Sequence, residues 1–344
     1  MTKKKKIVLS LSGAFVLISV LLVAAWGYRV VYMSNFFSEK TVYVFVDKHT
    51  TFDELCNDLY EKASCKRLSE FRILAEQLQY PQHMKTGRYA ISSGASNLEV
   101  LNILRRGQQT GVRITFNNIR FTKDLVKRLD EQLLLDSAEL MALLGDSAYC
   151  ASLGFNKETI RSMFIPNTYE VYWNISAQAL LKRLHREYKA FWNDDRLKKA
   201  KAIGLSPLEV SVLASIVEEE TAAADEFPLV AGLYLNRLRL NMPLQADPTV
   251  KYAVGDFGLK RILFEHLKVE SPYNTYLHVG LPPAPLRIPS VQTLNAVLHP
   301  ARHSFLYMCA KEDLSGRHNF AKTLAEHNRN ARRYQAELNR RKIR

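Results

Sequence analysis

The sequence predicts a membrane-anchored α+β protein with two folded parts, a small α+β module and a larger α+β domain. Three observations support this prediction: one long uncharged segment near the N-terminus, strand-like and helix-like segments in mixed order after it, and an unusually apolar helix followed by polar loops. A chain of 344 residues, 47% of them hydrophobic, is long enough to bury the cores of one large domain and a smaller one.

The N-terminal segment predicts a membrane anchor. Residues 7–26 are 20 consecutive residues without a charge, which is enough to cross a bilayer as a helix. Four lysines precede this segment and only Arg29 follows closely, so residues 1–6 are expected to be a cytoplasmic stub and the rest to lie on the periplasmic side of the plasma membrane. A cleaved signal peptide is the alternative. The apolar core of a signal peptide is normally shorter than residues 7–26, and Ala24-Ala25-Trp26 is a poor cleavage site.

After a linker at residues 27–40, residues 41–110 predict a small module. Its expected elements are a strand at Val42–Val46, helices at about 51–60 and 69–79, a strand at Gly87–Ile91 and a helix at Asn97–Arg106. This order resembles a LysM domain, a carbohydrate-binding module of cell-wall proteins, although other small α+β units share it.

Residues 111–328 are expected to form the larger domain, followed by a basic tail at 329–344. The predicted elements are a strand at 112–116, helices at 122–135, 137–144, 177–192, 225–239 and 290–298, and a strand at 305–309. The tail carries seven Arg or Lys residues against one acid, and we expect it to be solvated and partly disordered.

The central element of this domain is the helix that starts at Ser206. Ser206 is favourable at the N-cap position, and Pro207 is favourable in the first turn. The side chain of Glu209, three residues after the cap, can accept the backbone N–H of Ser206 and complete a capping box. The helix is apolar almost all round as far as Val217, which predicts that it is buried. Glu218 would then lie on its narrow polar face, either at the floor of a cleft or in a salt bridge to an arginine such as Arg237. The pattern alone favours the salt bridge, and the two glutamates that follow Glu218 are expected to be supporting or solvated.

Charge and cysteine content restrict the possible partners. The net charge of +14 could attract nucleic acid, anionic lipid or an acidic polymer, but no nucleic-acid-binding motif is present, so no nucleic-acid partner is expected. The four cysteines include no C-x-x-C pair, which argues against a zinc or redox site. Cys56 and Cys65 could pair in an exported domain, but two separate buried thiols are the preferred interpretation.

Polar residues in the loops after the apolar helix are candidates for binding a sugar. They are Gln245, Asp247, Asn274, Thr275, Tyr276 and His318. Amides and hydroxyls suit sugar hydroxyls, and a carboxyl group on a buried helix suits acid–base chemistry. The chain has no G-x-S-x-G or H-E-x-x-H motif, which leaves carboxylate acid–base chemistry as the best enzymatic hypothesis. No cofactor or metal is expected. Asp247 could also be only a turn residue, and His318 only a satisfied polar residue at a strand end.

Five ordered motifs resemble the YceG-like (MltG) family of endolytic murein transglycosylases. They are Leu213–Thr221, Leu244–Thr249, Tyr273–Tyr276, Gly280–Pro283 and His318-x-Phe320. The resemblance implies cleavage of peptidoglycan between N-acetylmuramic acid and N-acetylglucosamine within the strand, leaving a 1,6-anhydro end. It also implies Glu218 as the single acid and base, a role in terminating nascent strands, and peptidoglycan synthases (penicillin-binding proteins) as partners.

Three positions depart from the family pattern, and two other functions remain open. Arg161 lies where the family often has glutamate, Ala284 where it has glycine, and Ile288 where asparagine is common. One alternative function is a non-catalytic peptidoglycan-binding scaffold protein. The other is a two-carboxylate muramidase, which would hydrolyse the same bond and leave reducing ends.

Overall fold

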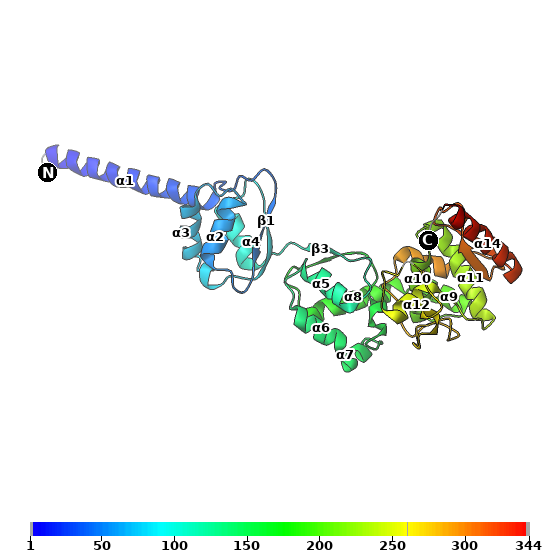
Figure 1. Cartoon of the computed structure of the whole chain (residues 1–344). Helices are drawn as coiled ribbons and strands as arrows, with labels where there is room; N and C mark the ends of the chain where they lie inside the picture. Colours follow the sequence, from blue (N-terminus) through cyan, green and yellow to red (C-terminus); the bar gives the residue numbers. More distant parts are fainter. Residues whose placement is uncertain (1–2, 260, 342–344) are drawn as a thin grey trace. The chain divides into compact units, whose positions relative to one another are not determined.

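The chain folds into two compact units of mixed α+β structure that are mostly helical (Figure 1). The computed structural model describes residues 3–259 and 261–341, with side-chain surroundings from residue 11 onward. The first unit comprises Met1–Arg113, Gln132–Leu134 and Glu170–Ile175, and the second comprises Ile114–Glu131, Leu135–Tyr169 and Ser176–Arg344. The predicted α+β class is confirmed.

The N-terminal helix α1 spans Lys3–Tyr32. Its segment Leu11–Tyr32 has a mean hydropathy of 2.1 and is almost wholly exposed, so it is long and apolar enough to cross a membrane. A single-pass anchor and a signal sequence both have this character. The predicted span began at Ile7, and the side chains of residues 7–10 lie outside the described part.

The first unit contains the predicted succession of strands and helices. Strand β1 (Val42–Val46) pairs antiparallel with β2 (Gly87–Ile91), with Val44 opposite Tyr89. Helices α2 (Phe52–Glu61), α3 (Leu68–Gln77) and α4 (Asn97–Arg106) pack against this sheet around one apolar core. Thr51 with Glu54 and Ser96 with Glu99 form capping boxes that set where α2 and α4 begin.

Cys56 and Cys65 are buried free thiols in the core of the first unit, as the preferred interpretation predicted. Burial raises the pKa of each thiol to about 11, so both are protonated at neutral pH.

The second unit is built mainly from helices. In chain order its elements are part of β3 (Val112–Thr115), α5 (Thr122–Asp130), α6 (Ser137–Gly145), α7 (Ser147–Ser152), part of β4 (Thr168–Val171), α8 (Ala177–Phe191), α9 (Asp194–Ile203), α10 (Pro207–Glu220), α11 (Phe227–Arg239), α12 (Asp247–Val254), α13 (Val291–Leu298), β5 (Tyr307–Ala310), β6 (His318–Ala321) and α14 (Leu324–Arg340). Short 3₁₀ helices include η2 (Thr159–Met163) and η3 (Ala224–Glu226). Strands β5 and β6 form an antiparallel hairpin.

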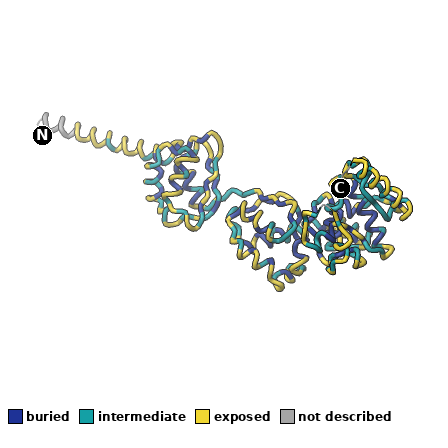
Figure 2. Tube along the Cα trace, in the orientation of Figure 1, coloured by how far each residue is buried: buried dark blue, intermediate teal, exposed yellow. Residues whose placement is uncertain are grey.

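Helix α10 is the buried centre of the second unit, as predicted. Its cap is the expected box of Ser206 with Glu209, and every residue from Val210 to Val217 is buried. Helices α9, α11, α12 and α13 pack around it. Figure 2 shows this buried segment in dark blue inside the second unit.

Two local expectations were wrong. Residues 245–249 were expected to form a loop, but residues 247–249 are the first turn of helix α12 (Asp247–Val254). Residues 329–340 belong to α14, so the basic segment is helical rather than partly disordered; residues 342–344 lie outside the described part. Asp247-Pro248 is typical of a turn as well as of a helix start, and the many charges of residues 329–340 are typical of a solvated tail as well as of an exposed helix.

Candidate functional site

Three consecutive glutamates end helix α10, and the structure places them in three different environments. Successive residues on a helix are about 100° apart, so adjacent side chains point in different directions. Only Glu220 lines the cavity that contains sequence-predicted sugar-binding residues.

The cavity beside Glu220 has a volume of about 290 Å³. It is bounded by α11, the α12 start, the loop before α13 and the β5–β6 hairpin, and its lining includes four of the six predicted sugar-binding residues: Gln245, Asp247, Tyr276 and His318. The sequence therefore singled out four polar residues of this lining, the carboxylate of Asp247 among them, but not Glu220.

The environment of Glu220 favours a protonated carboxyl group near neutral pH. Loss of solvation raises the pKa of Glu220 from 4.5 to about 7, and the nearby Asp247 charge acts in the same direction. Tyr234 opposes this effect by donating a hydrogen bond of 2.5 Å to Glu220 Oε1. Glu220 therefore gains and loses its proton in the pH range where an acid–base catalyst works best.

Other residues of this cavity are held by a compact hydrogen-bond network. Tyr276 donates to Asp247 Oδ1 at 2.7 Å, and Arg237 donates to Gln245 Oε1 at 3.2 Å. Gln245 has a left-handed backbone (φ 48°), which is costly for a residue with a side chain. Its N–H donates to the carbonyl of Thr275 at 3.0 Å, and this bond helps to hold the strained turn.

Asn274 and Thr275 are buried and do not line the cavity. Asn274 donates to the carbonyls of Leu267 and Val269, and its Oδ1 accepts the N–H of Tyr276. Thr275 Oγ1 accepts the N–H of Ala246 and lies 2.8 Å from Thr249 Oγ1. Their side chains are thus used to shape the loops that carry Gln245 and Tyr276.

Glu226, which the sequence analysis missed, joins the end of α10 to the hairpin. Its side chain is almost fully buried. Oε1 accepts the backbone N–H of His318 at 2.9 Å, and Oε2 accepts the hydroxyl of Thr221 at 3.1 Å and lies 2.9 Å from His318 Nδ1. Because Thr221 directly follows Glu220, Glu226 positions both Glu220 and His318. No local pattern marks it, since its partners lie up to 92 residues away.

Glu218 lies in a different set of contacts. Its Oε2 accepts the N–H of Ser290 and the hydroxyl of Thr293, each at 2.6 Å, and so holds the N-terminus of α13. The cation closest to it is Arg287, 3.7 Å from Oε1. The salt bridge that the helix pattern favoured is therefore present, with Arg287 rather than Arg237 as the partner.

Glu219 is the centre of an ion-pair cluster. Arg120 donates to both of its carboxylate oxygens at 2.7 and 2.8 Å, and Arg287 donates to Oε1 at 2.8 Å. Arg287 also donates to Asn118. These contacts tie the end of α10 to the segment before α5, so Glu219 is paired rather than solvated.

The three departures from the family pattern lie outside the Glu220 cavity. Arg161 is buried and donates to the carbonyl of Arg120 and to the hydroxyl of Tyr252. Ala284 and Ile288 are both buried, and the N–H of Ile288 donates to the carbonyl of Ile119. In the described part of the chain, no group of three or more His, Cys, Asp and Glu side chains is arranged to hold a metal ion.

Glu220→Gln is expected to stabilise the fold at pH 8 and to change it little at pH 4. The folded-state pKa of Glu220 is raised from 4.5 to about 7, so its stabilising contribution is complete below pH 4.5 and is lost as pH rises through 7. We expect a gain of about 1–3 kcal/mol at pH 8, since one pKa unit corresponds to about 1.4 kcal/mol and partial exposure reduces the effect. Urea unfolding of the detergent-solubilised chain measures it. A difference that is the same at both pH values would contradict the assigned environment.

Glu226→Gln is expected to lower the free energy of unfolding by about 1–3 kcal/mol, because the amide cannot satisfy the donors that meet at the carboxylate. Glu312→Gln is the matched control. Glu312 lies on the same hairpin with its side chain 38% exposed, so its loss should change stability by less than about 0.5 kcal/mol. Equal effects of the two substitutions, measured by urea unfolding, would argue against a positioning role for Glu226.

Comparison with known proteins identifies relatives of this chain. The sequence profile of the YceG-like family matches residues 44–333. The endolytic murein transglycosylase of Bacillus subtilis (strain 168) is 35% identical over 162 residues, which cover 47% of this chain and 43% of the relative. The protein of the same name from Streptococcus pneumoniae serotype 2 is 34% identical over 134 residues, which cover 38% of this chain and 24% of that relative. The matches thus span less than half the length of these relatives.

A solved structure supports the fold. The crystal structure of a yceG-like protein from Listeria monocytogenes matches 85% of this chain and 99% of its own with a TM-score of 0.53, at 23% sequence identity. The family profile covers most of the chain and includes all five sequence motifs. The chain therefore belongs to the YceG-like family.

Proposed function

We propose that this protein is an endolytic peptidoglycan lytic transglycosylase with Glu220 as its acid and base. The observation that carries the proposal is a carboxyl group with a pKa of about 7 in a cavity lined by amide, carboxylate, phenol and imidazole side chains. The names of the relatives support the same activity. Glu218, the residue that the sequence predicted, is engaged by Ser290 and Thr293 and does not line this cavity.

The proposed reaction needs only one carboxyl group. Protonated Glu220 delivers its proton to the glycosidic oxygen as the bond from the muramyl C1 to the O4 of N-acetylglucosamine breaks. Ionised Glu220 then accepts the proton of the muramyl 6-hydroxyl as O6 bonds to C1. The product carries a 1,6-anhydro ring, no water is consumed, and Glu220 ends protonated as it began. Tyr234 holds Oε1, and no described residue hydrogen-bonds Oε2, which is therefore available for proton transfer.

The other residues of the cavity are proposed to bind the sugar. Gln245 and His318 can hydrogen-bond hydroxyl or acetamido groups, and the ring of Tyr276 offers an apolar face. Asp247 can orient a hydroxyl group or stabilise positive charge that develops at C1. Asn274 and Thr275 are proposed to act indirectly, by holding the loops.

Two other functions would use the same surface differently. Asp247 shares the cavity with Glu220, so the cavity contains the two carboxyl groups that a two-carboxylate hydrolase needs. A scaffold protein would bind strands without cutting them, but it has no need for a desolvated carboxyl group. We further propose that α1 anchors the chain in the plasma membrane, and that residues 41–110 are a LysM-like module that binds the same glycan.

Glu220→Gln is expected to abolish the release of anhydro-muropeptides from purified sacculi, with a loss of at least about 100-fold, because the amide cannot transfer the proton. Glu218→Gln is the matched comparison on the same helix end. It retains a carbonyl oxygen for Ser290 and Thr293, so a loss of no more than about tenfold is expected. Mass spectrometry of the products measures both variants.

The outcomes separate the competing assignments. An inactive Glu218→Gln beside an active Glu220→Gln would restore the sequence-based prediction. Reducing ends, heavier than anhydro ends by one water, would identify a hydrolase. Binding of sacculi by the wild type without any product would identify a scaffold.

The rate of cleavage is expected to fall as pH rises above about 7, where Glu220 loses its proton. Tyr234→Phe removes a hydrogen bond that stabilises the ionised form, so the pKa of Glu220 should rise and the alkaline limb of the pH–rate profile should move to higher pH. Tyr60→Phe, at an exposed tyrosine of the first unit, is the control. A shift toward lower pH would contradict the assigned hydrogen bond.

A further inference from the structure

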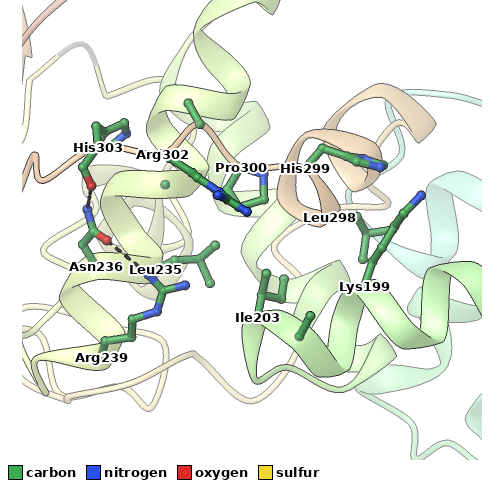
Figure 3. A pocket seen from close by; sticks show the side chains of 13 residues that line it. Lys199, Ile203, Leu235, Asn236, Arg239, Leu298, His299, Pro300, Arg302 and His303 are labelled. Carbon is green, nitrogen blue, oxygen red and sulfur yellow. Dashed lines mark hydrogen bonds between the residues drawn. The ribbon is translucent and has the colours of Figure 1, made fainter.

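A second cavity of about 530 Å³ lies in the second unit, between α9, α11 and the segment that follows α13 (Figure 3). Helix α11 lines both cavities with different faces. Leu233, Tyr234 and Arg237 face the Glu220 cavity, whereas Gly232, Leu235, Asn236 and Arg239 face the second one. At about 100° per residue these two sets lie on opposite sides of the helix. The second cavity is therefore a separate site that shares one wall with the first.

Cations from three separate segments line this second cavity. Lys199 comes from α9, Arg239 from the end of α11 and Arg302 from the segment after α13 (Figure 3). Its complete lining among the described residues contains no Asp or Glu. The site is therefore suited to an anionic ligand.

These cations keep most of their capacity to bind a ligand. Arg302 is exposed and makes no hydrogen bond or ion pair within the described part of the chain. Arg239 makes one long hydrogen bond of 3.4 Å to Asn236. Lys199 pairs with Asp195 one helical turn away, but that aspartate is 67% exposed, and such surface pairs contribute little and exchange readily.

The floor of the second cavity is apolar and rigidly held. Its apolar side chains include Ile203, Leu235, Leu298 and Pro300. Gly232 permits the segment after α13 to lie directly on α11, because a Cβ atom there would come within 2.5 Å of the Ala301 carbonyl oxygen. His303 lies 2.9 Å from the Leu229 carbonyl through Nε2 and accepts the N–H of Phe305 at Nδ1, so its ring is fixed from both sides.

We propose that this cavity binds the carboxylate-bearing peptide stems that branch from peptidoglycan strands. This inference rests on the proposed function, because it takes the polymer cut at Glu220 as the ligand. Arginine side chains match carboxylates with paired hydrogen bonds, and the apolar floor matches the methyl groups of alanine residues in the stems.

Helix direction favours carboxylates over phosphate at this position. Apart from Gly232, the lining residues of α9, α11 and α13 come from the second halves of these helices, toward the end where the helix dipole presents partial negative charge. Phosphate sites typically use helix N-termini instead. Single carboxylates, each met by one arginine, suit such a setting better than a doubly charged phosphate.

The test measures binding of a labelled synthetic stem peptide with free carboxylates to the full-length, detergent-solubilised chain by fluorescence anisotropy. Arg302→Gln and Arg239→Gln are each expected to weaken binding about tenfold through loss of a charge-assisted hydrogen bond. The same peptide with amidated carboxylates should bind at least about tenfold more weakly. Arg332→Gln, which removes an exposed cation of α14 outside the cavity, should leave the affinity unchanged.

Equal binding of the free and amidated peptides, or unchanged affinity in both cavity variants, would overturn the proposal. Displacement of the peptide by inorganic phosphate at a lower concentration than by unlabelled peptide would also overturn it, in favour of a phosphate site.

A kinetic experiment separates this proposal from the proposed function. Arg302→Gln should raise the KM for glycan strands that carry stems, and should leave the KM for stem-free strands and both kcat values unchanged. Peptide binding requires no cleavage. Normal peptide binding by a protein that releases no cleavage product would count against the transglycosylase assignment alone. Normal cleavage without peptide binding would count only against the proposed peptide site in the second cavity.

Discussion

Burial of helix α10 on nearly every side is the constraint on which the rest of the site depends. Its residues Val210–Val217 contact surrounding helices all round, so the helix cannot turn or slide without exposing apolar surface. The polar side chains at its C-terminal end therefore lie at fixed positions. Each of the three glutamates meets partners from a different element, and these contacts in turn hold the helix end in place.

The pKa of Glu220 results from two opposing effects on one carboxyl group. Loss of solvation disfavours its charge, while the hydrogen bond from Tyr234 favours it. Burial without the tyrosine would leave the group protonated over a wider pH range, and an exposed glutamate would be ionised at neutral pH. The same desolvation lowers the stability of the folded state when Glu220 is ionised, as is common where a site is organised for function rather than for stability.

Helix α11 forms a wall of both cavities and also holds side chains of the Glu220 cavity in place. Tyr234 and Arg237 on one face reach Glu220 and Gln245, while Gly232 on the other allows the chain after α13 to pack closely. Just before this helix, Glu226 links Thr221 to His318. A substrate polymer held on both faces of α11 would be fixed by its glycan at one cavity and by its peptide stems at the other.

The sequence by itself determined the α+β class, the apolar N-terminal helix, the buried helix α10 with its cap, and four side chains of the cavity, because each depends on local spacing or residue type. It could not determine which of Glu218, Glu219 and Glu220 faces the cavity. A helix that is apolar on almost all sides has no solvent-facing side to serve as a reference, and a step of one residue turns the side chain by about 100°. Only the packing of α11, α13 and the segment before α5 decided it, by placing Tyr234, Ser290 and Arg120 beside three different carboxylates.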